Sequence, residues 1–205
     1  MKGSNNIKNP QSQETANRIF NQALRIFLKK GYHGTSIDDI TKAARLSKGA
    51  LYWHFKGKEA LLRKIIEEFE KSFLDQMIHT VGKIKGGALD KIEKYIRFNS
   101  AFAYYNRELC VSFETLAGEL IGTHHRIEAN FKRIYKKYQQ FLSDLIIQGK
   151  KEGVFKKELN TDLAALAIMA FHHGVLVQWS INRDNINGEI FVKTFKEIMF
   201  NGLLA

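Results

Sequence analysis

The sequence predicts an all-α protein in which a three-helix N-terminal region with a helix-turn-helix precedes a larger helical bundle, about nine helices in total. Apolar residues recur at three- to four-residue spacing along most of the chain, as in helices with one buried face. The single proline, Pro10, lies near the start, so no proline interrupts the later helices. Two short helical patterns joined by a tight turn stand near residues 36–54.

We expect these two short helices over about 36–43 and 47–54. Thr35 and Ser36 each precede an aspartate by three positions, so either pair can form a capping box at the start of the first helix. Ser47 is the expected N-cap of the second helix. Its first turn carries only small or flexible side chains, namely Lys48, Gly49 and Ala50. Small residues allow a helix end to enter a DNA major groove, where a lysine can reach a base edge or a phosphate.

The residues from Gly34 to Leu62 read G-T-S-I-D-D-I-T-K-A-A-R-L-S-K-G-A-L-Y-W-H-F-K-G-K-E-A-L-L. This stretch resembles the N-terminal signature of the TetR family of one-component transcriptional regulators. The match is dense over about 18–62, and L-Y-W-H-F-K-x-K is highly specific to the family. One departure is Arg45, where many members have glycine in the turn. Because a positive φ is uncommon without glycine, either the turn is drawn differently or Arg45 tolerates mild strain.

The resemblance implies binding of double-stranded operator DNA through the second short helix. We expect base readout from Lys48 and phosphate contacts from the polar side chains around it. The full expected DNA-contacting set is Thr35, Ser36, Arg45, Lys48, Gly49, Ala50, Tyr52, His54 and Lys58. Trp53 and Phe55 are expected to pack inside the N-terminal region instead.

Positive charge is concentrated in the same region. Of the net charge of +11, residues 1–60 contribute +7, with eleven Lys or Arg against four acidic residues, and the rest of the chain contributes +4. A basic segment that coincides with a helix-turn-helix is typical of DNA binding, and charge for solubility is the alternative. We divide the chain into residues 1–57, a disordered arm with the DNA-binding domain, and residues 58–205, an effector-binding and dimerisation domain.

The sequence contains no run of about 18 apolar residues that would predict a membrane span. Its first 13 residues lack the apolar core of a signal peptide. The single cysteine, Cys110, excludes an intrachain disulfide and fits a reducing cytoplasm. We prefer an inert, buried role for Cys110 over redox sensing.

The remaining helices follow from apolar periodicity and glycine positions. The first is expected over about 13–30, with Gly31 as its C-cap. After Gly57, a long helix is expected over about 58–81, and it can act as a lever between the two domains. Glycines at 82, 86 and 87 predict a loop. Further helices are expected over about 89–105, 107–120, 125–151, 160–182 and 188–203.

The resemblance also implies an apolar effector pocket in the C-terminal domain, where aromatic residues are frequent. Its expected lining is Phe102, Tyr105, Phe113, Phe141, His172 and Trp179. Such a lining favours a hydrophobic or aromatic small molecule. The resemblance further implies a homodimer in which the last two helices of each protomer form a four-helix interface. The expected interface residues are Leu166, Ala170, Gly174, Val177, Phe191, Phe195, Ile198 and Met199.

Two adjacent histidine pairs, His124-His125 and His172-His173, raise the question of a metal. Neighbours in a helix point about 100° apart, so neither pair can chelate one ion in regular geometry. One histidine from each pair could meet with Glu119 or Glu128, but nothing in the spacing requires it, and we expect neither metal nor cofactor. A ligand-orienting role for His172 or His173 is the stronger interpretation.

The sequence contains no nucleophile motif and no paired-carboxylate signature, so we do not expect an enzyme. We expect a homodimeric, ligand-responsive transcriptional regulator, most simply a repressor. An architectural DNA-binding protein without an effector is the first alternative, and a helical metal-binding protein is the second.

Overall fold

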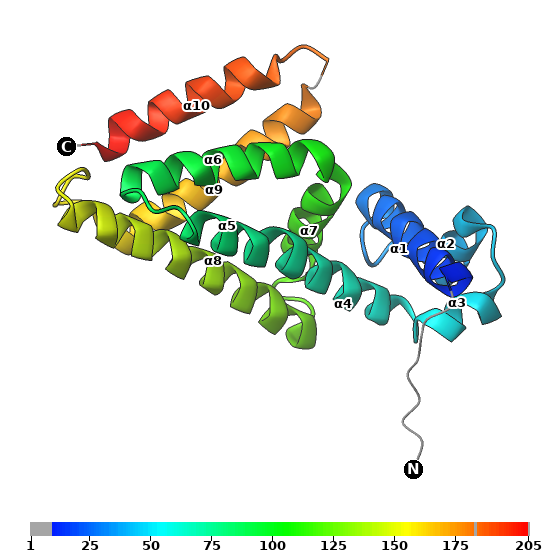
Figure 1. Cartoon of the computed structure of the whole chain (residues 1–205). Helices are drawn as coiled ribbons and strands as arrows, with labels where there is room; N and C mark the ends of the chain where they lie inside the picture. Colours follow the sequence, from blue (N-terminus) through cyan, green and yellow to red (C-terminus); the bar gives the residue numbers. More distant parts are fainter. Residues whose placement is uncertain (1–9, 183, 205) are drawn as a thin grey trace.

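The computed structural model describes residues 10–182 and 184–204, and this part of the chain forms nine helical runs without a β-strand (Figure 1). The predicted all-α fold is therefore confirmed. The N-terminal arm expected to be disordered lies mostly outside the described residues, although helix α1 begins earlier than predicted. It starts at Pro10, a favourable first helical residue because it has no amide hydrogen to leave unpaired.

Helices α1 (Pro10–Lys30), α2 (Ile37–Ala44) and α3 (Lys48–His54) lie together at one end of the molecule (Figure 1). The predicted C-cap at the end of α1 is present: Gly31 has a φ of 72° and donates its N–H to the carbonyl of Phe27 at 2.8 Å. The inner face of α1 is fully buried at Ile19, Ala23 and Phe27. This burial fixes the platform against which the helix-turn-helix packs.

One long helical run leads from this end of the molecule across the rest of it (Figure 1). It consists of α4 (Lys58–Phe69), the π-helical segment η1 (Glu70–Asp75) and α5 (Gln76–Gly82). Gly57 precedes it with a φ of 111°, a conformation that favours glycine. The length was predicted correctly, but the π segment was not. Such insertions are often found at functional sites.

The remaining helices are α6 (Ala88–Tyr105), α7 (Arg107–Leu120), α8 (His125–Lys151), α9 (Thr161–Ile181) and α10 (Gly188–Leu203). Helix α7 packs against α1 and so joins the two parts of the molecule. Helix α8 packs against α9 and against the long run, where Arg133 and Lys137 both contact the carboxylate of Glu70 in η1. Helix α10 lies on the side away from α1–α3 (Figure 1).

Helix α9 differs from an ordinary amphipathic helix. It has 21 residues, and an 18-residue window within it has a mean hydropathy of 1.4, so by length and composition alone it is apolar enough to cross a membrane. The core helix of a soluble protein can meet the same criterion, so this finding alone does not indicate a membrane span. Its residues buried by the rest of the chain are Ala165, Ile168, Met169 and Leu176. The structure thus leaves much of an apolar helix without cover.

Candidate DNA interface and effector pocket

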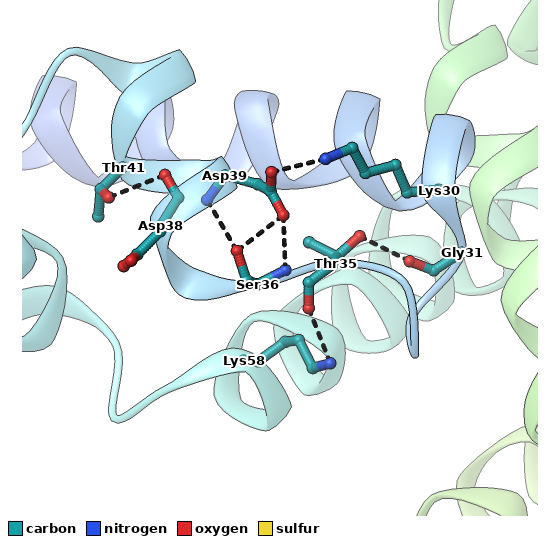
Figure 2. A network of polar contacts seen from close by, with 8 residues as sticks. All are labelled: Lys30, Gly31, Thr35, Ser36, Asp38, Asp39, Thr41 and Lys58. Atoms are coloured by element: carbon teal, nitrogen blue, oxygen red, sulfur yellow. Dashed lines mark hydrogen bonds and ion pairs between the residues drawn. The ribbon is translucent and has the colours of Figure 1, made fainter.

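The start of α2 is fixed by the capping box that the sequence predicts at Ser36. The Ser36 hydroxyl accepts the N–H of Asp39 at 3.1 Å, and the Asp39 carboxylate accepts the N–H of Ser36 at 2.9 Å. Lys30 reaches the same carboxylate at 2.6 Å (Figure 2). Mainly because of Lys30, and then of Ser36, the pKa of Asp39 lies far below its usual range. The network ties α2 to the end of α1.

Two residues expected to contact phosphates have internal partners instead. Thr35 is 3% exposed, and its hydroxyl donates to the carbonyl of Gly31 at 2.6 Å (Figure 2). The Lys58 ammonium group donates to the carbonyls of Tyr32 at 2.8 Å and Thr35 at 2.9 Å. Thr35 is therefore too buried to present its hydroxyl group to DNA. Lys58 holds the loop before α2 against the start of α4, and its contact with a phosphate stays a prediction.

The turn between α2 and α3 resolves the question raised by Arg45. Its backbone is left-handed, with φ 52° and ψ 49°, and its N–H donates to the carbonyl of Lys42 at 3.1 Å. The turn therefore has the geometry that suits glycine, and Arg45 tolerates it at a modest cost in strain. Arg45 itself is exposed in this turn, which leads into α3.

Helix α3 presents an exposed surface with basic, small and aromatic residues. Ser47 caps it by accepting the N–H of Ala50 at 3.1 Å. Lys48 is exposed and pairs at 2.6 Å with Asp38, which raises the pKa of Lys48. An exposed pair of this kind is weak, so a DNA phosphate or base can replace Asp38 as the partner.

The aromatic residues of α3 are distributed differently from the prediction. Tyr52 is 53% exposed, as a DNA-contacting residue should be, but Trp53 is 82% exposed and does not pack inside the domain. The expectation for Trp53 was therefore wrong. Phe55 does pack against the core, and His54 is half-buried beside it. Trp53 belongs with the exposed surface of α3, a position that helical periodicity could have suggested.

A pocket of about 660 Å³ lies between α6, α9 and α10. Its lining is Tyr95, Ile96, Arg97, Asn99, Ser100, Ala101, Ala103, Tyr104, His172, Val175, Leu176, Trp179, Ile186, Gly188, Glu189, Phe191, Val192 and Phe195. A cavity of this size suits a small organic ligand. His172 and Trp179 were predicted to line such a pocket. Most of the other lining residues were missed. Those on α6 were not predicted to face a cavity, and the contribution of α10 was assigned entirely to dimerisation.

The other predicted lining residues lie elsewhere, so these assignments were wrong. Phe113 is 1% exposed and stacks on Phe69, with ring centroids 3.7 Å apart. Phe102 packs on Phe73 at 5.2 Å, whereas Tyr105 is 81% exposed on the outer surface. Phe141 is half-buried against the core outside the pocket. The aromatic residues between α4, α7 and α8 form the packed core of the domain rather than a cavity.

Buried polar groups lie behind the inner wall of the pocket. The hydroxyl groups of Tyr95 and Tyr138 are 2.7 Å apart, and Tyr138 also donates to the side-chain carbonyl of Asn99 at 3.2 Å. Next to them, the Glu114 carboxylate accepts a hydrogen bond from Tyr135 at 2.7 Å and lies 3.2 Å from Nε2 of His173. Burial raises the pKa of Glu114, and it also raises that of Tyr95.

The residues expected at a dimer interface fall into two groups. Leu166, Val177 and Ile198 are 44–57% exposed, and Ala170 and Gly174 are exposed beside them. Phe191 lines the pocket, and Phe195 and Met199 are each only 8% exposed. The assignment of these three residues to an interface is corrected, because they pack within their own chain. Further exposed apolar residues of α9 and α10 are Leu163, Phe171, Ile181 and Ile190.

Within the described residues, no three or more His, Cys, Asp or Glu side chains are grouped so that they could hold a metal ion. His124 packs edge-on against Tyr32, far along the chain from the pair on α9. Cys110 is 5% exposed, and burial raises the pKa of its thiol to about 12. A thiol with such a pKa is unreactive at neutral pH.

Comparison with known proteins agrees with these features. Residues 19–65 match the family model of bacterial regulatory proteins of the tetR family, and residues 66–202 match the C-terminal region of YsiA-like proteins. The repressor DhaR of Mycobacterium sp. (strain GP1) is 24% identical over 81% of this chain and 82% of its own length. The fatty acid metabolism regulator protein of Bacillus subtilis is 22% identical over 91% of this chain and 94% of its own.

Solved structures show the same fold. The MbdR regulator of Azoarcus sp. CIB superposes with a TM-score of 0.84 and 30% identity, over 93% of this chain and all of its own. FadR of Bacillus subtilis, solved with stearoyl-CoA, superposes with a TM-score of 0.74 and 22% identity, over 90% of this chain and 97% of its own. The helix-turn-helix, the C-terminal helical domain and these matches lead to one conclusion. The chain belongs to the tetR family of bacterial regulatory proteins and is a DNA-binding transcription regulator.

Proposed function

We propose that this regulator is a cytoplasmic, homodimeric repressor that binds a palindromic operator and is released by a small apolar or aromatic effector. Residues 1–57 bind double-stranded DNA, and residues 58–205 bind the effector and form the dimer. The observation that carries the proposal is the single helical run α4–η1–α5, which starts beside the helix-turn-helix and, through Phe73, lies against His172 in the wall of the pocket.

Contact with DNA is proposed through the exposed surface of α3 and the turn before it. Lys48 reads a base edge, close approach is permitted by Gly49 and Ala50, and Arg45 and Tyr52 bind phosphates. Ser36 and His54 flank this surface. Two copies of α3 reach successive major grooves if the dimer holds them about 34–36 Å apart.

Dimerisation is proposed through the exposed apolar surface of α9 and α10. Leu166, Val177 and Ile198 would lose contact with water there, with Ala170 and Gly174 allowing close helix approach. A partner subunit explains why so apolar a helix as α9 is only partly covered by its own chain. We prefer a second subunit to a membrane as the cover of this surface, because its small residues Ala170 and Gly174 allow another helix to approach closely.

The effector is proposed to be hydrophobic because aromatic and aliphatic side chains dominate the pocket. Two of the matches from Bacillus subtilis bear on its class: the curated relative is named a fatty acid metabolism regulator protein, and the solved structure is FadR in complex with stearoyl-CoA. An acyl thioester is therefore the first class of compound to test. Arg97 lines the pocket and is exposed, so it can form an ion pair with a negatively charged group of the ligand that remains in solvent.

Release from DNA requires that the effector bind the DNA-incompetent arrangement more tightly than the competent one. A coupling of about 1–3 kcal/mol changes operator affinity roughly 5- to 150-fold, which is enough to relieve repression. Within this chain, Phe73 of η1 connects the two sites. Its ring stacks on that of His172 in the pocket wall, with centroids 6.4 Å apart, and it belongs to the helical run that leads to α3.

The proposal is tested by native mass spectrometry of freshly purified protein followed by selection of binding sites from random double-stranded DNA. We expect a dimer, a palindromic consensus and weaker binding to it when stearoyl-CoA or a co-purified molecule is added. A consensus with no response to any bound molecule contradicts the effector part. Binding without sequence preference contradicts the regulator and favours the architectural alternative.

A further inference from the structure

Most polar groups in the inner wall of the pocket are already hydrogen-bonded within the chain. The Asn99 amide donates to the carbonyl of Tyr95 at 2.8 Å, and the Tyr95 hydroxyl is bonded to that of Tyr138. The Ser100 hydroxyl donates to the carbonyl of Ile96 at 2.9 Å. Because these groups already have hydrogen-bond partners within the chain, a hydrogen bond to one of them would add little to the free energy of ligand binding.

His172 is different. Its Nδ1 atom is buried and has no hydrogen-bond partner among the described residues. The ring lines the pocket on α9, and it lies against Phe73 and Tyr95 at centroid distances of 6.4 and 6.3 Å. Desolvation lowers the pKa of His172 to about 3, with a smaller contribution from His173, so the imidazole is neutral at physiological pH. A buried polar atom without a hydrogen-bond partner is uncommon in proteins, so the free Nδ1 of His172 requires an explanation.

We propose that His172 is the specificity-determining contact of the pocket and that it hydrogen-bonds an uncharged oxygen of the effector. This inference rests on the proposed function, because it assumes that the pocket is the effector site. The ligand class is an aryl or alkyl compound with a hydroxyl, ketone or thioester carbonyl oxygen in its buried part. The apolar part occupies the space bounded by Trp179, Phe191 and Val192.

The oxygen that His172 binds is expected to be uncharged because the imidazole ring itself is neutral. A neutral imidazole offers one donor and one acceptor but no positive charge to balance a carboxylate. A carboxylate beside His172 would be desolvated without a counter-ion, which is strongly unfavourable. The pocket does contain Arg97, but its side chain is 74% exposed and already lies 3.7 Å from Glu93. Charged parts of a ligand therefore belong at the mouth and the uncharged oxygen at His172.

A structural role for His172 is the competing explanation. A small cavity of about 10 Å³ lies on the inner side of the ring, bounded also by Asn99, Glu114 and Tyr138. This volume is close to the minimum for one water molecule. If such a water satisfies Nδ1, then the ring is part of the buried polar network, and its replacement would not change which ligands bind.

The two explanations are distinguished by probes that differ in one group. The full chain carrying Trp53→Phe has Trp179 as its sole tryptophan, so its fluorescence reports occupancy of the pocket. Without DNA, we would titrate this protein with 4-phenylbutan-2-one, with butylbenzene and with 3-phenylpropanoate, which replaces the methyl group of the ketone by a negatively charged oxygen. The same titrations are repeated in the His172→Phe variant, which removes both nitrogens, and in His172→Gln, which keeps a donor and an acceptor.

We expect the ratio of ketone affinity to hydrocarbon affinity to fall about 2- to 10-fold in His172→Phe and to recover largely in His172→Gln. We also expect the carboxylate to bind more weakly than the ketone. An unchanged ratio in His172→Phe overturns the inference and assigns the ring to the buried network. A carboxylate that binds as tightly as the ketone, or a wild-type pocket that binds neither neutral probe, overturns it as well.

Failure of this inference is distinguishable from failure of the proposed function. Selection of an operator and its release by stearoyl-CoA are measured with the unmodified chain, so they test the proposed function whether or not His172 contacts the ligand. A regulator whose operator is released by an effector, but whose ketone-to-hydrocarbon ratio is unchanged in His172→Phe, refutes the role of His172 alone. A protein that selects no operator refutes the proposed function whatever the probes show.

Discussion

The carboxylate of Glu119, near the end of α7, accepts the backbone N–H of Tyr32 at 2.7 Å and also that of His33 at 2.8 Å. Tyr32 stands in the loop between α1 and α2, and its carbonyl accepts a hydrogen bond from Lys58 at the start of α4. One short loop is thus held by a carboxylate from α7 and an ammonium group from α4. The orientation of the helix-turn-helix relative to the rest of the chain depends on both.

The first prediction concerns Glu119. Glu119→Ala leaves two backbone donors without their charged partner, so we expect the free energy of unfolding to fall by about 1–3 kcal/mol. The control is Glu108→Ala. Glu108 also lies on α7, but it forms an exposed ion pair with Arg25 of α1. We expect that change to cost less than about 1 kcal/mol. Urea unfolding of both variants measures the difference, and equal effects would show that the Glu119 contact does not anchor the loop.

The second prediction separates stability from DNA contact at Lys58. Because its ammonium group is held by two carbonyls, Lys58→Ala should lower the free energy of unfolding by about 1–2 kcal/mol. The neighbouring Lys56 is exposed, and Lys56→Ala should leave stability nearly unchanged. Thermal unfolding tests both. If Lys58→Ala unfolds like the wild type but reduces the salt dependence of operator binding by about one unit of slope, then Lys58 contacts a phosphate after all.

The third prediction concerns base readout by Lys48. Lys48→Ala should cost about 1–3 kcal/mol of operator binding and reduce the preference for operator over random DNA. Asp38→Asn is the control, since it removes the intramolecular partner of Lys48 and one negative charge while keeping the lysine. This variant should bind DNA at least as tightly as the wild type. Competition titrations measure the preference, and an unchanged preference in Lys48→Ala rules out base readout by this residue.

The fourth prediction concerns the proposed dimer surface. Val177→Glu and Ile198→Glu place a charge on exposed positions of α9 and α10, so we expect monomers with an unchanged helix content. Ile121→Glu, at an exposed apolar residue just after α7, should remain dimeric. Phe195→Asp is unsuitable as a test, because Phe195 is buried in its own chain and the change should unfold the protein. Sedimentation velocity with circular dichroism distinguishes these results, and dimers in both α9 and α10 variants would place the interface elsewhere.

The sequence predicts the helix boundaries well because the signals are local. Ser36 and Asp39 form their capping box within one turn, and Gly31 and Gly57 adopt the positive φ angles that end or precede a helix. The family resemblance added the DNA-binding role. The surface of α3 follows from both, apart from Trp53, whose aromatic character suggested burial although the helix presents it to solvent.

Contacts between distant segments could not be predicted in the same way. Thr35 and Lys58 are far apart in sequence, so nothing local indicated that the Lys58 ammonium group bonds to the carbonyl of Thr35. The pocket lining depends on how α10 folds back over α6 and α9, and apolar periodicity does not distinguish a face that lines a cavity from one that packs against a helix. For that reason Phe191 was assigned to the interface.

The last prediction concerns the buried carboxylate of Glu114. Burial raises its pKa above the usual 4.5, although His173 and the hydroxyl of Tyr135 partly offset this effect. Below about pH 4.5, Glu114 is protonated in both the folded and the unfolded chain and contributes no pH dependence. As pH rises from there through the raised pKa, the unfolded chain releases its proton first, so the folded state loses stability.

Each unit by which the pKa is raised corresponds to about 1.4 kcal/mol lost at high pH. We therefore expect the difference in free energy of unfolding, wild type minus Glu114→Gln, to fall as pH rises from 4.5 towards neutrality. Denaturant titrations at several pH values measure it. Glu128→Gln is the control, because Lys132 holds the pKa of Glu128 below its usual range and no loss should occur over this interval. A difference that instead grows with pH would mean that attraction to His173 outweighs the burial of Glu114.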